Sequence, residues 1–450
     1  MMATKRRVRD MLLRLKTRVE IQDTEFYKRL TIRINHQGVS VRDTEIGAKI
    51  GTKSQFRIRA GDFILSKIDA RQGAFGIVPP EADDGIITGN FWTYRVDNQL
   101  VDTEWFLQFT NSDAFLDLCK RSSTGNTHRK YLNENIFLNH ELSIPSLEEQ
   151  RKAVVSCKAG YKRVEEVQHE TTHQQSLLAK LKQAILQEAI QGKLTADWRA
   201  AHPDVEPASQ LRHRIQAEKA RLIAAKKLRP EKPLPPITPA EIPFEIPKGW
   251  EWCRLGATLE EKPRNGVSLK PVEHVTNAKT LKLSATSSGT FDGSQTKYLD
   301  LDVEEDSYLW LRDGDILIQR ANSLELVGTA AVYRGAPSEF IYPDLMMKCR
   351  AVFPESTDYL HHVLSARITR DYFKSKASGS AGNMPKVNQD TVINTLIPLP
   401  PLAEQAAIVE RVEALMTTCR LLEAEIEQAR THAAHLLQAV LKEAFAPASA

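Results

Sequence analysis

The chain has 450 residues, of which 42% are hydrophobic and 26% are charged, and its formal net charge is +4. This length exceeds one ordinary hydrophobic core and predicts a soluble globular protein of two or three domains. No apolar run approaches the about 18 residues that cross a membrane. Five scattered cysteines without a Cys-x-x-Cys pair exclude a disulfide framework and a zinc site, and they favour a reducing compartment.

The first predicted domain opens on a basic segment, Lys5 to Arg18, in which Asp10 is the single acid. Such a segment is compatible with a targeting peptide or a nucleic-acid arm. Runs of this kind are more often the solvated face of a helix, and we interpret the segment as such a face.

Strand and helix patterns follow in the same domain. Apolar and polar residues alternate from Phe56 to Ala60, and a second apolar run, Phe63 to Leu65, follows a Gly-Asp turn, so a hairpin or strand pair is predicted. Trp105 to Leu118 has helical spacing. The polar and basic segment from Ser122 to Lys130 is predicted to be a loop.

A long helix is predicted next, from Leu147 to Ile190, with Ser146 and Glu149 as its capping box. Gly192 ends this helix. Residues 193–246 are first charged and then rich in proline, so we predict a spacer that contains a short basic helix, Arg212 to Lys227.

The second predicted domain repeats the features of the first in the same order. A Gly314-Asp315 turn precedes an apolar strand, Ile316 to Ile318. A helical stretch from Tyr359 to Phe373 follows, and then a small, polar segment from Ser378 to Lys386 that is predicted to be a loop.

The last helix, Leu402 to Phe445, carries apolar residues at the 4-3 spacing of a coiled coil. An offset of 255 residues places Leu402 on Leu147 and matches Leu-Ala-Glu-Gln with Leu-Glu-Glu-Gln, without a gap along either helix. This match predicts an internal duplication and two helices that pair in antiparallel fashion. The polar seam residues Thr171 and Gln174 suggest the hypothesis that helices of another subunit complete the packing there.

The predicted fold class is therefore α+β, with two mixed α/β domains separated by two long antiparallel coiled-coil helices in a pseudo-twofold repeat. The predicted boundaries are 1–145 for the first domain, 146–192 for the central helix, 193–246 for the linker, 247–398 for the second domain and 399–446 for the C-terminal helix.

No catalytic grouping is found in the sequence. There is no Walker A loop, and none of the Pro-Pro pairs lies in the Asp/Asn-Pro-Pro-aromatic context of an amino-methyltransferase. Pro343-Asp344 is not followed by the Glu-x-Lys of a metal nuclease, and His361-His362 point to different sides of a helix and are not expected to bind a metal. We therefore predict no catalytic residue, no cofactor site and no metal site.

Several motifs carry a family resemblance. They are Ile-Pro-Ser-Leu-Glu-Glu-Gln at 144–150, Ile-Pro-Leu-Pro-Pro-Leu-Ala-Glu-Gln at 397–405, Pro-Lys-Gly-Trp-Glu-Trp at 247–252, Gly-Asp-Ile-Leu at 314–317, Arg-Ala-Asn-Ser at 320–323, Leu-Val-Gly at 326–328 and Lys-Val-Asn-Gln at 386–389. In these motifs the chain resembles the specificity subunits of type I restriction-modification systems over nearly its whole length. The first domain departs from the pattern because it lacks the Pro-x-Gly-Trp-x-Trp entry.

The resemblance implies a non-catalytic DNA-recognition subunit with two target-recognition domains. Each domain would read one half of a bipartite, asymmetric target in double-stranded DNA, and the two helices would set the spacing. Two methyltransferase subunits and the restriction-translocase subunits would dock on it, and they would bind S-adenosylmethionine, ATP and Mg²⁺. The implied location is the cytoplasm of a bacterium or archaeon, with no membrane contact.

Base reading requires donors and acceptors on loops, with Arg or Lys pairing to guanine and Asn or Gln to adenine. In the first domain the predicted DNA-binding residues are Lys67, Arg71, Gln72, Asn126, His128, Arg129 and Lys130. In the second domain they are Arg264, Asn265, Gln319, Arg320, Asn322, Lys374, Lys376, Asn383 and Lys386. The alternative is a coiled-coil adaptor that binds proteins instead of DNA.

Overall fold

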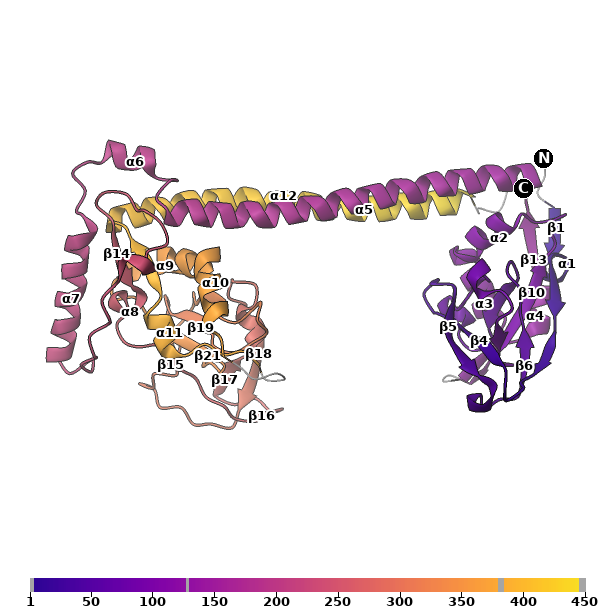
Figure 1. Ribbon diagram of the computed structural model, residues 1–450, viewed down its shortest axis with the longest axis horizontal. Helices are drawn as coiled ribbons and strands as arrows, with labels where there is room; N and C mark the ends of the chain where they lie inside the picture. The colour runs from indigo at the N-terminus through magenta and orange to yellow at the C-terminus, as the bar shows by residue number, and fades with distance from the viewer. Residues whose placement is uncertain (1–3, 127–128, 379–383, 445–450) are drawn as a thin grey trace. The chain divides into compact units, whose positions relative to one another are not determined.

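The computed structural model describes residues 4–126, 129–378 and 384–444, and the chain folds into two compact units (Figure 1). The first unit comprises Met1–His173 and Ile426–Ala450, and the second comprises Gln174–Glu425. Each unit holds one mixed domain and a part of both long helices, which confirms the predicted α+β class. No helix in the described ranges is both long enough and apolar enough to cross a bilayer.

The mixed domain of the first unit is built on two sheets. A four-stranded antiparallel sheet has the order β2-β10-β7-β8, and a five-stranded sheet has the order β3-β6-β9-β4-β5. The strands are β1 (Thr4–Arg7), β2 (Leu12–Leu15), β3 (Arg18–Glu20), β4 (Phe26–Ile32), β5 (Val39–Ile46), β6 (Ser54–Arg57), β7 (Phe63–Ser66), β8 (Phe75–Ile77), β9 (Ile86–Ile87), β10 (Phe91–Val96), β11 (Ser123–Asn126), β12 (Arg129–Leu132) and β13 (Glu141–Ile144). The helices are α1 (Val8–Met11), α2 (Thr103–Thr110), α3 (Asp113–Arg121) and α4 (Glu134–Asn139).

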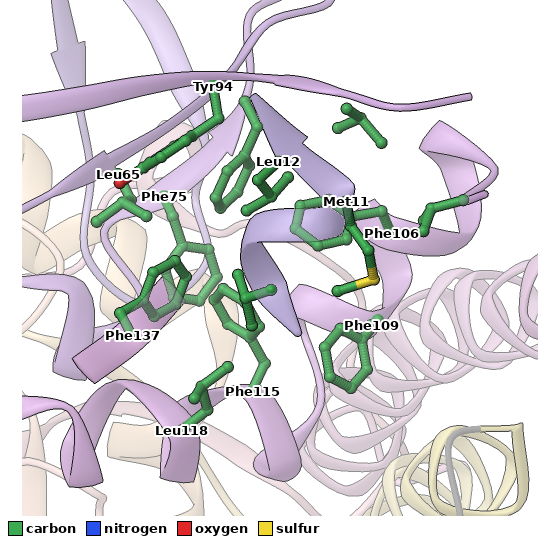
Figure 2. Close-up of a cluster of buried hydrophobic side chains, with 14 of the residues drawn as sticks. Met11, Leu12, Leu65, Phe75, Tyr94, Phe106, Phe109, Phe115, Leu118 and Phe137 are labelled. Carbon is green, nitrogen blue, oxygen red and sulfur yellow. The ribbon is translucent and has the colours of Figure 1, made fainter. Parts of the chain in front are cut away.

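Aromatic rings form the core between the four-stranded sheet and helices α2 and α3. Phe63 meets Phe106 edge to face at 4.9 Å between ring centroids, and Phe75 meets Phe115 in the same way at 4.9 Å. Such T-shaped pairs add about 0.5–1.5 kcal/mol each beyond the area they bury. Figure 2 shows Phe75, Phe106 and Phe115 in one cluster of buried side chains, together with Met11 from α1 and Leu12 from β2.

The basic opening segment is therefore not a solvated helix face, and that prediction is wrong. Lys5 and its neighbours lie exposed on β1, which pairs with β13 so that Thr4 faces Ile144. Val8 and Met11 are buried in α1. The pairing partner lies far along the chain, so a local pattern of charge could not reveal the strand.

Three local predictions in this unit also change. β6 and β7 lie in different sheets and do not form a hairpin, because the chain passes between the sheets at the Gly-Asp turn. The helical stretch is divided into α2 and α3, and the Ser112 hydroxyl caps α3 by accepting from the amide of Phe115. The predicted loop at 122–130 is a β11–β12 hairpin in which Ser123 faces Leu132.

The mixed domain of the second unit contains a four-stranded antiparallel sheet in the order β15-β21-β19-β20 and a three-stranded sheet in the order β16-β18-β17. The strands are β14 (Glu251–Arg254), β15 (Arg264–Asn265), β16 (Pro271–Val272), β17 (Ala278–Leu281), β18 (Thr296–Leu299), β19 (Ile316–Gln319), β20 (Ala330–Val332), β21 (Met346–Cys349) and β22 (Leu396–Leu399). The helices outside the long pair are α6 (Ala196–Ala201), α7 (Ala208–Ala224), α8 (Leu255–Thr258), α9 (Thr357–Ser365), α10 (Arg367–Lys376) and α11 (Gln389–Ile393).

The two four-stranded sheets repeat one another in their hydrogen bonds as well as in their strand order. The Asp62 carboxylate accepts from the amide of Arg59 at 3.0 Å, and the Asp315 carboxylate accepts from the amide of Arg312 at 2.8 Å. Both aspartates are buried. The Gly-Asp motif thus fixes the turn that starts the central strand of each domain.

The paired edge strands repeat too. β1 pairs with β13 in the first unit, and β14 pairs with β22 in the second, where Glu251 faces Leu399. A short helix follows the first strand of each pair, α1 or α8. The opening of the first domain therefore matches the opening of the second in structure, although it lacks the sequence motif.

The two long helices are α5 (Leu147–Ile190) and α12 (Leu402–Ala444), and within each unit their segments run antiparallel, as predicted. In the first unit a Cβ on Gly160 would lie 3.4 Å from Val440, and Arg430 donates to the Thr171 hydroxyl at 3.1 Å. In the second unit Lys182 pairs with Glu423 at 2.6 Å.

The seam of the helices is buried at every seventh residue. On α5 the buried series is Cys157, Val164, Thr171, Leu178 and Ile185, and on α12 it is Val412, Cys419, Ile426 and Ala433. Gln174 is exposed and lies outside this series. Thr171 is 3% exposed and accepts from Arg430 of the same chain, so the hypothesis that another subunit completes the seam at Thr171 is wrong.

The connector between α5 and the second domain is not a spacer. Its helix α7 buries Leu211 and Ile215. Arg254, which is 7% exposed, donates to the carbonyl oxygens of Pro235 and Pro236 at 2.8 and 3.0 Å. The proline-rich segment is thus held along the second domain by a buried guanidinium group, a contact that composition could not predict.

A buried carboxylate joins the connector to α12. Glu404 of the Leu-Ala-Glu-Gln motif is fully buried, and its oxygens accept from the Thr195 hydroxyl at 2.7 Å and the Trp250 indole at 2.7 Å. Arg199 also donates to it at 2.8 Å. The tryptophan of the second domain's entry motif therefore contacts the glutamate that opens the last helix.

Gly192 lies at the same junction and ends α5, as predicted. Its φ is +70°, and a Cβ there would lie 2.6 Å from Pro247 and 3.0 Å from Trp250. A side chain would therefore be strained by the left-handed backbone and would also collide with its neighbours.

We expect low pH to weaken the contact between the connector and the second domain at Glu241 and Arg254. The amide of Thr238 and then the guanidinium of Arg254 lower the pKa of Glu241 from 4.5 to about 2. Because the pKa of Glu241 is lower in the folded chain than in the unfolded chain, its ionised carboxylate stabilises the fold. This stabilisation is fully present above the ordinary pKa of 4.5 and is lost as the pH falls toward 2. We expect the stability difference between the wild type and Glu241→Gln to shrink over this range in denaturant unfolding. Glu245→Gln, in the same segment, is the matched control, and a constant difference would contradict the prediction.

Candidate nucleic-acid interface

One hydrogen bond recurs at the same place in both mixed domains. In the first, the Leu132 amide donates to the Lys67 carbonyl at 2.8 Å. In the second, the Val387 amide donates to the Arg320 carbonyl at 2.9 Å. In each bond the acceptor, Lys67 or Arg320, directly follows the central strand, β7 or β19. The donor directly precedes an asparagine, Asn133 or Asn388, that caps the next helix. A basic side chain, Lys67 or Arg320, thus occupies the same position in each domain.

Three of the predicted residues of the first domain lie together. The Lys67 ammonium lies over the Trp92 ring at 5.6 Å, and burial followed by the charge of Arg14 lowers the pKa of Lys67. Arg71 donates to the Lys130 carbonyl at 3.4 Å. Gln72 is exposed at the end of a single 3-10 turn beside Arg71. Lys67, Arg71 and Lys130 define what we call the first basic platform.

The β11–β12 hairpin carries the rest of the first set. Asn126 faces Arg129 in its register. His128 lies outside the described residues. The base of the hairpin is joined to the first basic platform, since the Leu132 amide donates to the Lys67 carbonyl.

In the second domain Arg320, Asn322 and Lys386 lie together. Ala321 forms a bridge with Lys386, and the Asn322 amide donates to the Pro385 carbonyl at 3.4 Å. Lys386 is exposed, and Arg320 is partly exposed. These three residues form the second basic platform.

Gln319 is not available to DNA, and its prediction is wrong. The side chain is fully buried, and its amide nitrogen donates to Leu283, Thr286 and Ser287 at 3.0–3.1 Å. Its oxygen accepts from Asn322 at 2.6 Å. Gln319 is the last residue of the central strand and points inward, an orientation that the loop assignment did not foresee.

The other predicted residues of the second domain occupy two places. Arg264 and Asn265 form β15 at the edge of the sheet, and the Arg264 guanidinium lies 3.5 Å from the Tyr308 ring centroid. Lys374 and Lys376 end α10, with Lys376 exposed and Lys374 partly buried. Asn383 lies outside the described residues.

The N-terminal basic segment contributes two residues that sequence reasoning missed. Arg14 and Lys16 are near enough to Lys67 that their charges lower its pKa. Arg14 is committed to Glu134 at 2.6 Å, whereas Lys16 is exposed. The basic run in the sequence could have identified these two residues as candidates for DNA binding. Its interpretation as a solvated helix face excluded them from the predicted set.

No group of three His, Cys, Asp or Glu side chains suited to a metal ion occurs in the ranges that the structure describes. The His361 ring nitrogen lies 3.1 Å from the carbonyls of Gly289 and Ala330, and His362 is buried. The two histidines therefore pack within the second unit.

Comparison with known proteins agrees with this architecture. Residues 286–430 match the family model described as "Type I restriction modification DNA specificity domain". The specificity subunit of the type I restriction enzyme EcoEI from Escherichia coli is 31% identical over 264 residues, or 58% of this chain and 44% of that relative. The EcoAI specificity subunit, also from Escherichia coli, is 27% identical over 79% of this chain and 67% of the relative. The chain thus spans less than half the length of the first relative and about two thirds of the second.

A solved structure has the same fold over almost its full length. The crystal structure of the HsdS subunit from Thermoanaerobacter tengcongensis aligns with a TM-score of 0.55 and 18% identity, covering 98% of this chain and 96% of that chain. The fold of two mixed domains and two long helices is thus shared with that structure. Residues 286–430 thus match the specificity domain of type I restriction-modification systems, and the chain is similar to their specificity subunits, as the resemblance seen in its motifs indicates.

Proposed function

We propose that this chain is the DNA-reading subunit of a type I restriction-modification complex. Each mixed domain contacts one half of a bipartite, asymmetric target in double-stranded DNA. The observation that carries the proposal is the repeated bond that places Lys67 and Arg320 at equivalent points of the two domains. A basic group beside an exposed hairpin or loop suits contacts to phosphate oxygens and to guanine edges.

The proposal leaves catalysis to other subunits. The chain acts without a cofactor of its own, and S-adenosylmethionine, ATP and Mg²⁺ belong to two methyltransferase subunits and to the restriction-translocase subunits. Since its target is DNA, the proposed location of the protein is the cytoplasm. The modest charge of +4 fits such sharing, because partners would supply further phosphate contacts.

An apolar stripe on the long helices supports a partner-binding role. Leu415 and Leu422, one heptad apart on α12, are each 40% exposed, and Leu181 on α5 is 46% exposed. These positions alternate with the buried series, so at Leu181, Leu415 and Leu422 the second series of the heptad pattern is partly exposed. We propose that methyltransferase helices cover this stripe.

Charge placed on the stripe should prevent that docking. We expect Leu415→Glu with Leu422→Glu to abolish co-purification of the methyltransferase, because burying two carboxylates in an apolar seam is unfavourable. Thr417→Glu with Ala424→Glu has the same spacing on another side of α12 and should retain the partner. Equal recovery with both double variants in a pull-down would contradict the prediction.

The function itself is tested by methylation mapping. The full chain is co-expressed with a methyltransferase subunit of a type I restriction-modification system, and methylated bases are located by sequencing. We expect a split, asymmetric target when both are present and no methylation from the chain alone. An unsplit target, or none, would overturn the two-domain proposal.

A further inference from the structure

The four-stranded sheets of the two units can be superposed by their strand pairing. This superposition shows which residues occupy equivalent positions where the two sequences do not align. In the first unit Thr93 of β10 faces Ile64 of β7 on one side and Leu15 of β2 on the other. In the second unit Lys348 of β21 faces Leu317 of β19 and Arg264 of β15.

The Gly-Asp turns identify Ile64 with Leu317, because each lies three residues after its glycine. It follows that Leu15 occupies the position of Arg264. The next residues, Lys16 and Asn265, then correspond.

The surroundings of Lys16 agree with this assignment. β2 ends at Leu15, and one further step in its register with β10 would bring Lys16 opposite Trp92, whose ring lies under the Lys67 ammonium. The charge of Lys16 is also one of the causes that lower the pKa of Lys67, after burial and after Arg14. Lys16 and Lys67, which directly follow β2 and β7, thus lie close enough for their charges to interact.

Lys16 is also free to act on a ligand. Its side chain is exposed, and within the described residues it forms no ion pair. Arg14, by contrast, is held by Glu134 and lies over the Tyr94 ring at 5.3 Å. Two neighbouring ammonium groups repel one another, and an anionic or electron-rich ligand that contacts both would relieve that repulsion.

We infer that Lys16 is a DNA-contacting residue of the first domain, at the position that Asn265 holds in the second. This inference rests on the proposed function. The acceptor is an oxygen or nitrogen of the duplex, either a phosphate oxygen or the O6 and N7 edge of a guanine. The two domains then differ at this position in chemistry, since lysine only donates whereas asparagine both donates and accepts.

The test uses the complex of the full chain with its methyltransferase and a duplex that carries the mapped target. We expect Lys16→Gln to raise the Kd roughly 5- to 100-fold, the usual range for one specific contact. Lys16→Arg should stay close to wild type. Lys5→Gln removes an exposed charge from the same basic run, but on β1 in a separate sheet, and should have little effect.

Two further measurements separate the sources of the acceptor. If Lys16 meets a phosphate, the slope of log affinity against log salt falls by about 1, and all sequences weaken alike. If it meets a guanine, discrimination is lost at one position of one half-site. The inference is overturned if the Lys16→Gln and Lys5→Gln complexes have the same Kd, the same salt slope and the same discrimination between bases. That outcome leaves the proposed function unchanged. A wild-type complex without affinity for the duplex overturns both.

Discussion

Replacing Glu404 with alanine should destabilise the second unit by about 3–5 kcal/mol, the usual cost of removing one partner of a buried ion pair. The carboxylate is fully buried and accepts from Arg199, Thr195 and Trp250. Its loss leaves the Arg199 guanidinium without its carboxylate partner and the Trp250 indole N–H without its acceptor. Urea unfolding of the full chain measures the change, and we expect the junction of the connector with α12 to open first.

The internal repeat supplies the control. Glu149 is the residue equivalent to Glu404, but it is only partly buried and caps its own helix by accepting from the Ser146 amide at 2.9 Å. Glu149→Ala should cost about 1 kcal/mol, as loss of a capping contact does. The two glutamates differ because Pro401 stands where Ser146 stands and offers no side chain or N–H to a capping box. Equal losses for the two variants would refute the role assigned to Glu404.

Removing the three charges of the first basic platform should reduce DNA affinity by roughly 100-fold or more at moderate salt. The variant is Lys67→Gln with Arg71→Gln and Lys130→Gln. Each lost phosphate contact lowers the salt slope by about 0.9, so the slope should fall by up to about 3. Fluorescence anisotropy of a labelled duplex over a series of salt concentrations measures both quantities in the complex with methyltransferase.

The control for this variant removes the same charge elsewhere on the first domain. Lys5, Arg42 and Lys49 are exposed and belong to β1, to β5 and to the turn after β5. Their triple glutamine variant should bind nearly as the wild type does, since the net charge alone does not select the site. If both triple variants lose affinity equally, the effect is general electrostatics and the platform is not a site.

Local and periodic features were predictable from the sequence. The bounds of α5, the antiparallel pairing, the Ser146–Glu149 capping box and the end of the helix at Gly192 all depend on neighbouring residues or on one repeat. The family resemblance followed from motifs of the same kind.

The DNA-contact set was predictable only in part. Lys67, Arg71 and Lys130 do come together in the structure, but the loop assignment misplaced Gln319 and omitted Lys16. Whether a polar residue near a strand end points inward or outward depends on the register of its sheet. That register is set by partners more than twenty positions away in the chain, as for Lys348 with Leu317 and with Arg264.

The sequence by itself determined the duplication, the long helices and the turns that start each central strand, because periodicity, capping and glycine conformation act within a few residues. Only the tertiary structure decided that the basic opening is a strand and a buried helical turn, that the connector is bound by Arg254, and that Glu404 is fully buried while Glu149 is partly exposed. The physical reason is the same in each case: burial and hydrogen bonding join residues that are distant in the chain, and the free energy of those contacts overrides local propensity.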